Sequence, residues 1–175
     1  PRILNGICSF YVALFRGTPI VVQLLVAYYA LMPMIGAKLP GLQVAMIVFG
    51  MNSGAYISEI MRSGIQSVDN GQMEAGRAVG LSFGTSMIKI VIPQAVKNIL
   101  PTLGNEFIAL IKETSVVSFI AVADLYMAFN YIGTNSYEFM VPYLVMALIY
   151  IVLVLIITLL VRILERSLKK SDRRN

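Results

Sequence analysis

Four apolar stretches dominate the pattern of hydrophobic and polar positions along the chain. They cover about residues 18–35, 42–61, 99–122 and 139–161. A helix needs about 20 predominantly apolar residues to cross the hydrocarbon core of a bilayer, so each stretch is close to the length of one span. The third is the most polar, and it fits either one broken helix or two half-helices. The pattern predicts an all-α integral membrane protein with about four transmembrane helices.

Composition supports a membrane protein and excludes most soluble classes. Hydrophobic residues make up 58% of the 175 residues and charged residues 13%, against about 45–50% and 25% in soluble domains. The length favours a single domain covering residues 1–175. With one cysteine and no histidine, the chain lacks an intramolecular disulfide and the commonest metal ligand and general base. We therefore expect no metal site.

The basic residues predict the orientation of the chain. If the spans alternate in direction, all fourteen basic residues except Lys38 and Lys112 fall on one side of the membrane. The positive-inside rule makes that side cytoplasmic, together with the N-terminal end, the 62–97 segment and the C-terminus. The net charge of +5 then reflects topology, and we expect no nucleic-acid partner.

The two ends of the chain carry separate expectations. Residues 165–175 are expected to form a cytoplasmic tail. Its Lys169–Asn175 run is expected to be solvated, and the alternative is contact with anionic membrane lipid. The chain opens with Pro1-Arg2 and no methionine. We therefore expect it to be a fragment that an earlier hydrophobic segment precedes.

The segment between the second and third spans, about residues 67–93, predicts two short helices outside the membrane. Asp69-Asn70-Gly71 is a turn that can cap a helix over 72–79, and Gly80 is suited to end this helix in a left-handed conformation. The first helix carries small and charged side chains. It can dock into a groove of a partner or lie on lipid, and physics alone favours neither.

The second short helix is expected to start at Thr85 or Ser86. It should end near Pro93, because proline lacks the backbone N–H and restricts the residue before it.

One motif in this segment resembles a family pattern. Glu74-Ala75-Gly76, Gly80 six residues after the glutamate, and then Ile90, Ile92 and Pro93 resemble the EAA motif of ABC importer permeases. The spacing fits throughout. Gly76 stands where the motif has a second alanine and Ile92 where it has leucine, and both changes are small or conservative.

Other segments resemble the polar amino-acid uptake branch of these permeases. They are residues 15–19 leading into Gln23, residues 53–62, and Lys112-Glu113-Thr114-Ser115. The resemblance covers about residues 10–166. It implies the type I importer fold with five transmembrane helices per subunit, of which this chain would supply the last four and a short coupling helix.

The resemblance also implies partners. They are a second permease subunit, identical or related; two cytoplasmic ATP-binding subunits; an extracytoplasmic solute-binding protein; an amino-acid substrate; and the lipid of a bacterial plasma (inner) membrane. ATP and Mg²⁺ would be bound by the ATPase subunits, and no cofactor by this chain. Because hydrolysis would belong to the ATPase subunits, no catalytic residue is expected in this chain, which contains nothing resembling a P-loop. The residues implied to couple the chain to the ATPase are Gln72, Glu74, Ala75, Gly76, Ala78, Gly80, Leu81 and Pro93.

Polar residues inside the spans are candidates for a transport path, because they are costly in lipid. Glu59 and Arg62 are three residues apart and can pair on one helix face, either to hold the helix end or to act as a gate. Asn52, Ser53 and Tyr56 share a face of the second span. They can line a path or form ordinary interhelical hydrogen bonds.

A second polar group lies in the third stretch. Lys112 and Glu113 are expected to neutralise each other, while Thr114 and Ser115 could offer hydroxyls to a zwitterion. Asp124 could attract an ammonium group. The candidate path comprises Asn52, Ser53, Tyr56, Glu59, Glu113, Thr114, Ser115 and Asp124. Because acids outnumber bases in the spans, the substrate leans towards a cationic amino acid such as arginine, lysine or histidine.

Two other classes of protein were weighed against a permease. A proton- or ion-coupled secondary transporter or channel subunit explains the spans and their charges, but it has no use for the motif from Glu74 to Pro93. An assembly subunit without its own path explains that motif, but not the polar positions at 52–59 and 112–115.

Overall fold

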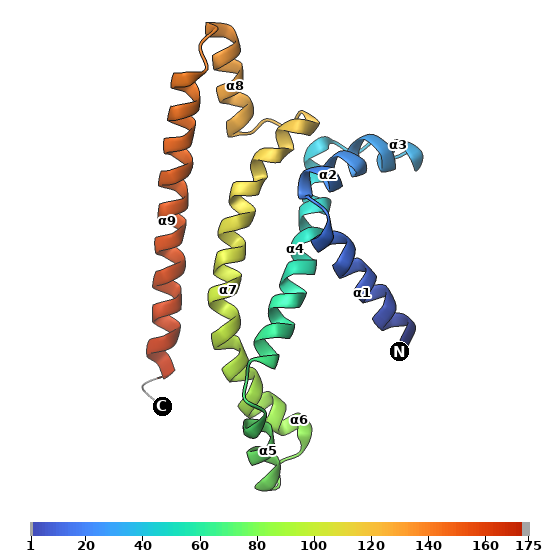
Figure 1. Ribbon diagram of the computed structural model, residues 1–175, viewed down its shortest axis with the longest axis vertical. Helices are drawn as coiled ribbons and strands as arrows, with labels where there is room; N and C mark the ends of the chain where they lie inside the picture. The colour runs from blue at the N-terminus through green and yellow to red at the C-terminus, as the bar shows by residue number, and fades with distance from the viewer. Residues whose placement is uncertain (1, 173–175) are drawn as a thin grey trace. The chain divides into compact units, whose positions relative to one another are not determined.

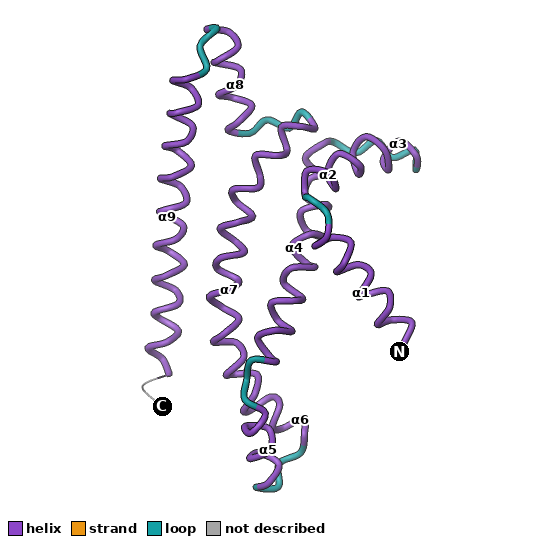
Figure 2. The backbone as a smooth tube through the Cα atoms, viewed as in Figure 1, coloured by secondary structure: helices purple, strands orange, loops and turns teal. Residues whose placement is uncertain are grey.

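The computed structural model describes the backbone of residues 2–172 and the side chains of residues 2–166. Helices joined by short loops make up this part of the chain, and no strand occurs in it (Figures 1 and 2). The prediction of an all-α protein is confirmed. In chain order the elements are α1 (Arg2–Gly17), α2 (Ile20–Leu25), the π-helix η1 (Val26–Leu31), α3 (Met32–Met34), α4 (Gly41–Gln66), α5 (Asn70–Ala78), α6 (Phe83–Ser86), the π-helix η2 (Met87–Val91), α7 (Ile92–Glu113), the 3-10 helix η3 (Thr114–Ile120), α8 (Leu125–Ser136) and α9 (Met140–Asp172).

The chain folds into two compact units. Unit 1 contains Pro1–Tyr56 and Ile108–Ile156, and unit 2 contains Ile57–Phe107 and Ile157–Asn175. The long helices α4, α7 and α9 each contribute residues to both units. The candidate coupling segment therefore belongs to unit 2, and most of the polar positions of the candidate path belong to unit 1.

The core of unit 1 is a cluster of small and branched apolar side chains. It joins the first span, α4 and η3 through Leu24, Ala27, Val44, Ala45, Val48 and Ile120. Gly41 opens α4 where the chain packs closely, since a Cβ at this position would lie 2.9 Å from Val122 Cγ2. The tight contact fixes η3 against the start of α4.

The first predicted span is helical over Ile20–Met34, and a sharp bend separates it from the preceding helix α1. α1 and the helical stretch Ile20–Met34 meet at an angle of 108°. Pro19 sits at the bend in an extended conformation and lacks the N–H that would continue α1. Gln23 holds the bend, because its side-chain amide donates to the Phe15 carbonyl at 2.8 Å and to the Thr18 carbonyl at 2.9 Å. Residues 2–17, to which the pattern assigned no element, form α1.

Among the described residues, two helices are long and apolar enough to cross a membrane. They are α4, Gly41–Gln66, and the part of α9 from Met140 to Arg166. The bent pair of α1 and Ile20–Met34 is a third candidate if it counts as one span. α7 occupies the position of the remaining predicted span, and its 22 residues correspond to a length of about 33 Å.

The third predicted stretch is a broken helix, one of the two possibilities that the sequence left open. α7 ends at Glu113, η3 follows, and Ala121 then takes a left-handed conformation with φ of 58°. α7 also begins at Ile92, seven residues before the predicted start.

The last helix continues into the C-terminal tail. α9 continues to Asp172, so most of the tail expected at 165–175 is helix, and residues 173–175 lie outside the described part of the chain.

Small residues bring the helices of unit 2 together. A Cβ on Gly64 of α4 would lie 2.2 Å from Ile99 of α7, and one on Gly104 of α7 would lie 2.4 Å from Val161 of α9. Both distances are shorter than real Cβ contacts, so these helices approach closely only because glycine has no side chain. Asn98 adds a hydrogen bond to Ser67 at 2.8 Å.

Candidate functional site

The first helix of the coupling segment is specified by its ends. Asp69 caps α5, and its Oδ1 accepts a hydrogen bond from the Gly71 N–H at 2.7 Å. α5 ends at Ala78, and Gly80 adopts φ of +90°, a conformation that favours glycine. The Leu81 N–H then donates to the Gly76 carbonyl at 3.1 Å. The predicted cap, short helix and left-handed glycine are all confirmed.

The second helix of the segment differs from the prediction. It begins at Phe83 with Ser82 as the cap, whose hydroxyl accepts from the Thr85 N–H at 3.2 Å, and not at Thr85 or Ser86. The helical path also continues through Pro93, so the predicted end there is wrong. The π-helical turn η2 precedes the proline, and a wider turn tolerates the missing N–H. Gln94 donates its side-chain amide to the Ile90 carbonyl at 3.0 Å beside this site.

Gly76 is the contact point between α5 and the helix that leads into α7. It is buried, and a Cβ there would lie 2.8 Å from both Ser86 Oγ and Ile90 Cδ1. Ser86 is fully buried, and its hydroxyl has no hydrogen-bond partner among the described residues. The departure of Gly76 from the motif alanine therefore has a physical reason, which is the close approach of α5 to α6 and η2. A further hydrogen bond, from Gln94 to Gln72 at 3.1 Å, ties α5 to the start of α7.

The opposite side of the coupling segment is open. Glu74, Ala75 and Ala78 of α5 are exposed. Two large apolar side chains lie beside them, Val79 with 78% and Phe83 with 56% of its surface exposed. Leu81 is half-buried. The segment thus combines exposed charged and apolar side chains with a buried packing contact at Gly76.

Glu59 and Arg62 form the predicted pair on α4. Arg62 donates from Nε to Glu59 Oε1 at 3.0 Å and from a terminal nitrogen to Oε2 at 2.7 Å. It also donates to Gln66 at 2.9 Å. Two-pronged guanidinium–carboxylate pairs are the strongest of their kind, although this one is largely exposed. The geometry fits a helix-end clamp and a gate equally.

The other predicted positions of α4 lie in unit 1. Asn52 is buried, with 4% of its surface exposed, and Ser53 has a buried hydroxyl without a partner in the described residues. The Tyr56 ring lies under the Arg16 guanidinium, 5.4 Å from its central carbon. In the part of the chain that the structure describes, no hydrogen bond joins Asn52, Ser53 or Tyr56 to residues 112–124.

The hydroxyl groups at the end of α7 donate hydrogen bonds to backbone carbonyls of the preceding turn. Thr114 donates its hydroxyl to the Ile111 carbonyl at 2.7 Å, and Ser115 donates to the Lys112 carbonyl at 3.2 Å. Within the described residues no ion pair joins Lys112 to Glu113, because neighbouring side chains on a helix point in different directions. The predicted mutual neutralisation is wrong. Lys112 and Ser115 instead line a cavity of about 470 Å³ together with Tyr150, Ile151 and residues 154–155 of α9.

Asp124 is the cap of α8. Its Oδ1 accepts from the Met127 N–H at 2.7 Å, while Oδ2 is buried and has no partner in the described residues. This position therefore has a structural task that the sequence analysis did not assign to it. The second carboxylate oxygen takes no part in the cap.

Three contacts were missed at the level of the sequence. They are the packing of Ser86 under Gly76, the hydrogen bond from Tyr11 to the Met51 carbonyl, and the position of Arg16 over Tyr56. Each joins residues that are distant in the sequence or lie on different helices, so helical periodicity gives no signal for them. No group of metal-binding side chains occurs among the described residues.

Comparison with known proteins gives one consistent family. Residues 1–170 match the model of the binding-protein-dependent transport system inner membrane component. A putative glutamine transport system permease protein of Rickettsia bellii is 40% identical over 146 residues, which cover 83% of this chain and 67% of the relative. The arginine transport system permease protein of Bacillus subtilis is also 40% identical, over 81% of this chain and 65% of its own length.

Solved structures agree on the fold. A crystal structure of an amino acid ABC transporter with histidines superposes with a TM-score of 0.88 and 40% identity, over 95% of this chain and 77% of the other. The methionine transporter MetNI, at 19% identity and a TM-score of 0.74, shows the same type I importer fold. The chain therefore belongs to the family of binding-protein-dependent transport system inner membrane components, as a permease subunit of the amino-acid ABC transporters.

Proposed function

We propose that the chain forms the translocation path of an ATP-driven amino-acid importer and docks on two cytoplasmic ATPase subunits through residues 67–93. ATP and Mg²⁺ belong to those subunits. The observation that carries the proposal is the construction of the coupling segment, which is packed from one side at Gly76 and open on the other at Glu74. A transporter without a cytoplasmic partner would not need an extramembrane segment that exposes charged and apolar side chains on one side.

The docking face is suited to insertion of a short helix into a groove. Ala75 and Ala78 allow close approach, Val79 and Phe83 offer apolar area, and the Glu74 carboxylate sets the register. Movement of the ATPase subunits would pass through the contact of α5 with η2 and then along α7, because α5, η2 and the part of α7 up to Phe107 belong to one compact unit. The geometry of α5, η2 and α7 would be maintained by Gln72, Gly80, Leu81 and Pro93.

The remaining partners follow from the same proposal. A second permease subunit, identical or related, would complete the path, and an extracytoplasmic solute-binding protein would deliver the substrate. The basic residues place residues 62–97 and the C-terminus in the cytoplasm of a bacterium, with the chain in its inner membrane. The candidate path residues are Asn52, Ser53, Tyr56, Glu59, Glu113, Thr114, Ser115 and Asp124, with Arg62 paired to Glu59 as a gate or clamp.

The substrate proposed is a polar amino acid, with a lean towards a cationic side chain. The relatives named for glutamine and for arginine are equally identical to this chain, so the lean rests on charge alone. Glu59 is paired with Arg62. Residues 112–124 then contain two carboxylates, the exposed Glu113 and Asp124 with its unpaired Oδ2, and one base, Lys112. An excess of carboxylates favours an ammonium or guanidinium group.

The energy source of uptake tests the proposed function. The complete transporter is reconstituted in vesicles, with ATP on the side of the ATPase subunits and solute-binding protein on the other. Uptake of labelled amino acid should require ATP and persist after a protonophore collapses the proton gradient. Uptake that a proton or sodium gradient drives without ATP would instead establish the secondary transporter.

A further inference from the structure

Lys38 is isolated in an otherwise uncharged part of the chain. It is the only charged residue from 17 to 58, in the loop between α3 and α4. It is also one of the two basic residues that the positive-inside pattern leaves unexplained. A lysine beside the end of a membrane-spanning helix can extend its ammonium group to the lipid headgroups, where a cation finds phosphate.

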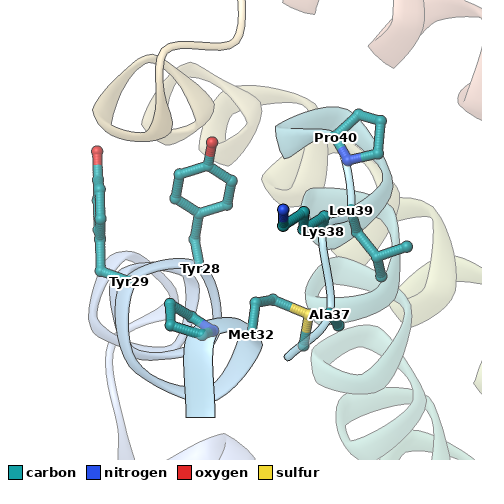
Figure 3. Close-up of a pocket in the computed structure, with 8 residues that line it drawn as sticks. Tyr28, Tyr29, Met32, Ala37, Lys38, Leu39 and Pro40 are labelled. Atoms are coloured by element: carbon teal, nitrogen blue, oxygen red, sulfur yellow. The ribbon is translucent and has the colours of Figure 1, made fainter. Parts of the chain in front are cut away.

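The loop around Lys38 is hollowed. A cavity of about 580 Å³ lies between the end of the first span and the loop, and Tyr28, Tyr29, Met32 and Lys38 are among the residues that line it. Figure 3 shows the Tyr28 ring and the Lys38 ammonium group on opposite sides of this cavity, with Met32 between them. Gly36, with φ of +68°, makes the turn that carries the loop back towards α4.

The polar side chains that line the cavity are those of Tyr28, Tyr29 and Lys38, and none of them is an acid. The Tyr29 hydroxyl donates to the Phe119 carbonyl at 3.2 Å, which fixes that ring, while the Tyr28 ring packs edge-on against it. Within the described residues no carboxylate pairs with Lys38. The cavity therefore offers an ammonium group and a tyrosine hydroxyl to an acceptor that the chain itself does not supply.

Exposed apolar side chains lie close in the sequence to the residues that line the cavity. Met34 and Ile35 expose 81% and 70% of their surface, and Leu42 at the start of α4 exposes 58%. In a membrane protein such side chains face acyl chains. One cation and one hydroxyl set beside an apolar surface match a molecule with a phosphate at one end and hydrocarbon at the other.

We propose that this cavity, which we name the Lys38 cavity, binds the phosphodiester headgroup of an anionic membrane phospholipid. The Lys38 ammonium group and the Tyr28 hydroxyl donate to the phosphate oxygens, and the acyl chains run along Met34 and Ile35. Charge complementarity selects the occupant, because the cavity has a cation without a counterion and no acid to hold a zwitterion's ammonium group.

The test measures lipid retained by the transporter purified with its partner subunits. The protein is reconstituted with phosphatidylglycerol or phosphatidylcholine, extracted into detergent, and analysed by native mass spectrometry. Wild type should retain phosphatidylglycerol in preference to phosphatidylcholine. Lys38→Gln should weaken this retention about fivefold, since one basic residue near a membrane surface contributes about that factor. Lys38→Arg should keep it, and Lys89→Gln, which removes an exposed lysine elsewhere, should leave it unchanged.

Two further arms identify the source of the phosphate. Tyr28→Phe should lower retention less than Lys38→Gln, and soluble inorganic phosphate should not displace the lipid at millimolar concentration. Equal retention by wild type and Lys38→Gln would overturn the proposal, as would equal retention of phosphatidylcholine or displacement by inorganic phosphate. Because Lys38 is exposed, its replacement should leave the melting temperature unchanged. An unchanged melting temperature therefore serves as the folding control.

Discussion

The coupling segment, residues 67–93, and the segment from Lys112 to Asp124 are both polar islands in an apolar chain, yet they use their polar groups differently. In the coupling segment the helix ends are satisfied by Asp69 and Ser82, and Glu74 stays free on the surface. In the second segment, residues predicted to contact substrate form hydrogen bonds to the backbone of nearby helices. Asp124 caps α8, and Thr114 donates to its own helix.

This difference separates two kinds of polar residue. Where capping and recognition are divided between different residues, a substitution at the recognition position changes binding and leaves the fold intact. Where one residue performs both tasks, its replacement changes both, and only a variant that keeps the cap can separate them. The three predictions below use this distinction.

The largest effect is expected from charge reversal on the docking face. Glu74→Arg should release the ATPase subunits during purification, because an interface charge that meets its own sign costs about 2–5 kcal/mol, or about thirtyfold or more in affinity. The measurement is the ratio of ATPase to permease after affinity purification, together with the melting temperature of the permease. The melting temperature should stay the same, since Glu74 is exposed.

Gly84→Ala is the matched control for this change. It lies in the same segment, and a Cβ there meets no atom within 4 Å. It should leave both ATPase binding and stability unchanged. Full retention of ATPase by the Glu74 variant would place the docking face elsewhere on the chain.

A smaller effect is expected beneath the docking face, where α5 packs on its support. Gly76→Ala should destabilise the segment by about 1–3 kcal/mol, because its Cβ would lie 2.8 Å from Ser86 Oγ and Ile90 Cδ1. Ser86→Ala should by itself stabilise the protein or leave it unchanged, since it removes a buried hydroxyl without a partner. The double variant should be less destabilised than Gly76→Ala, as measured by thermal unfolding in detergent.

Hydrogen exchange of α5 tests whether the contact of Gly76 with Ser86 also transmits movement from the ATPase subunits. Gly76→Ala should raise exchange in residues 70–78 and lower transport per ATP hydrolysed, and the double variant should restore part of both. If Gly76→Ala changes neither stability nor exchange, the helix tolerates a shift of α5, and the close contact is not the point through which movement passes.

The same contrast shows what could be predicted from the sequence. The cap at Asp69, the helix after it and the left-handed Gly80 were predicted correctly, because each depends on one residue and its near neighbours. The continuation of the helix through Pro93 was not, because the compensation lies in the π-helical turn before it and in the Gln94 side chain. The same holds for the bend at Pro19, which Gln23 stabilises from the next helix.

In the candidate site too, contacts within one helix could be predicted from the sequence and contacts between helices could not. The Glu59–Arg62 pair was predicted from helical spacing and is confirmed. The packing of Gly76 against Ser86 was not predicted, because residues ten positions apart on different helices share no periodicity. The expected pairing of Lys112 with Glu113 failed because charge alone was considered and side-chain direction was not.

The smallest and most selective effect is expected at Asp124, where cap and charge coincide. Asn caps a helix about as well as Asp, so Asp124→Asn should change the unfolding free energy by less than about 0.5 kcal/mol, whereas Asp124→Ala should cost about 1 kcal/mol. The asparagine removes the charge of the buried, unpartnered Oδ2. If that oxygen attracts a cationic substrate, Asp124→Asn lowers the initial rate of arginine uptake severalfold and leaves glutamine uptake unchanged. An equal loss for both substrates assigns Asp124 to the fold alone, and no loss for either removes it from the path. In either case the lean towards a cationic substrate loses one of the two carboxylates on which it rests.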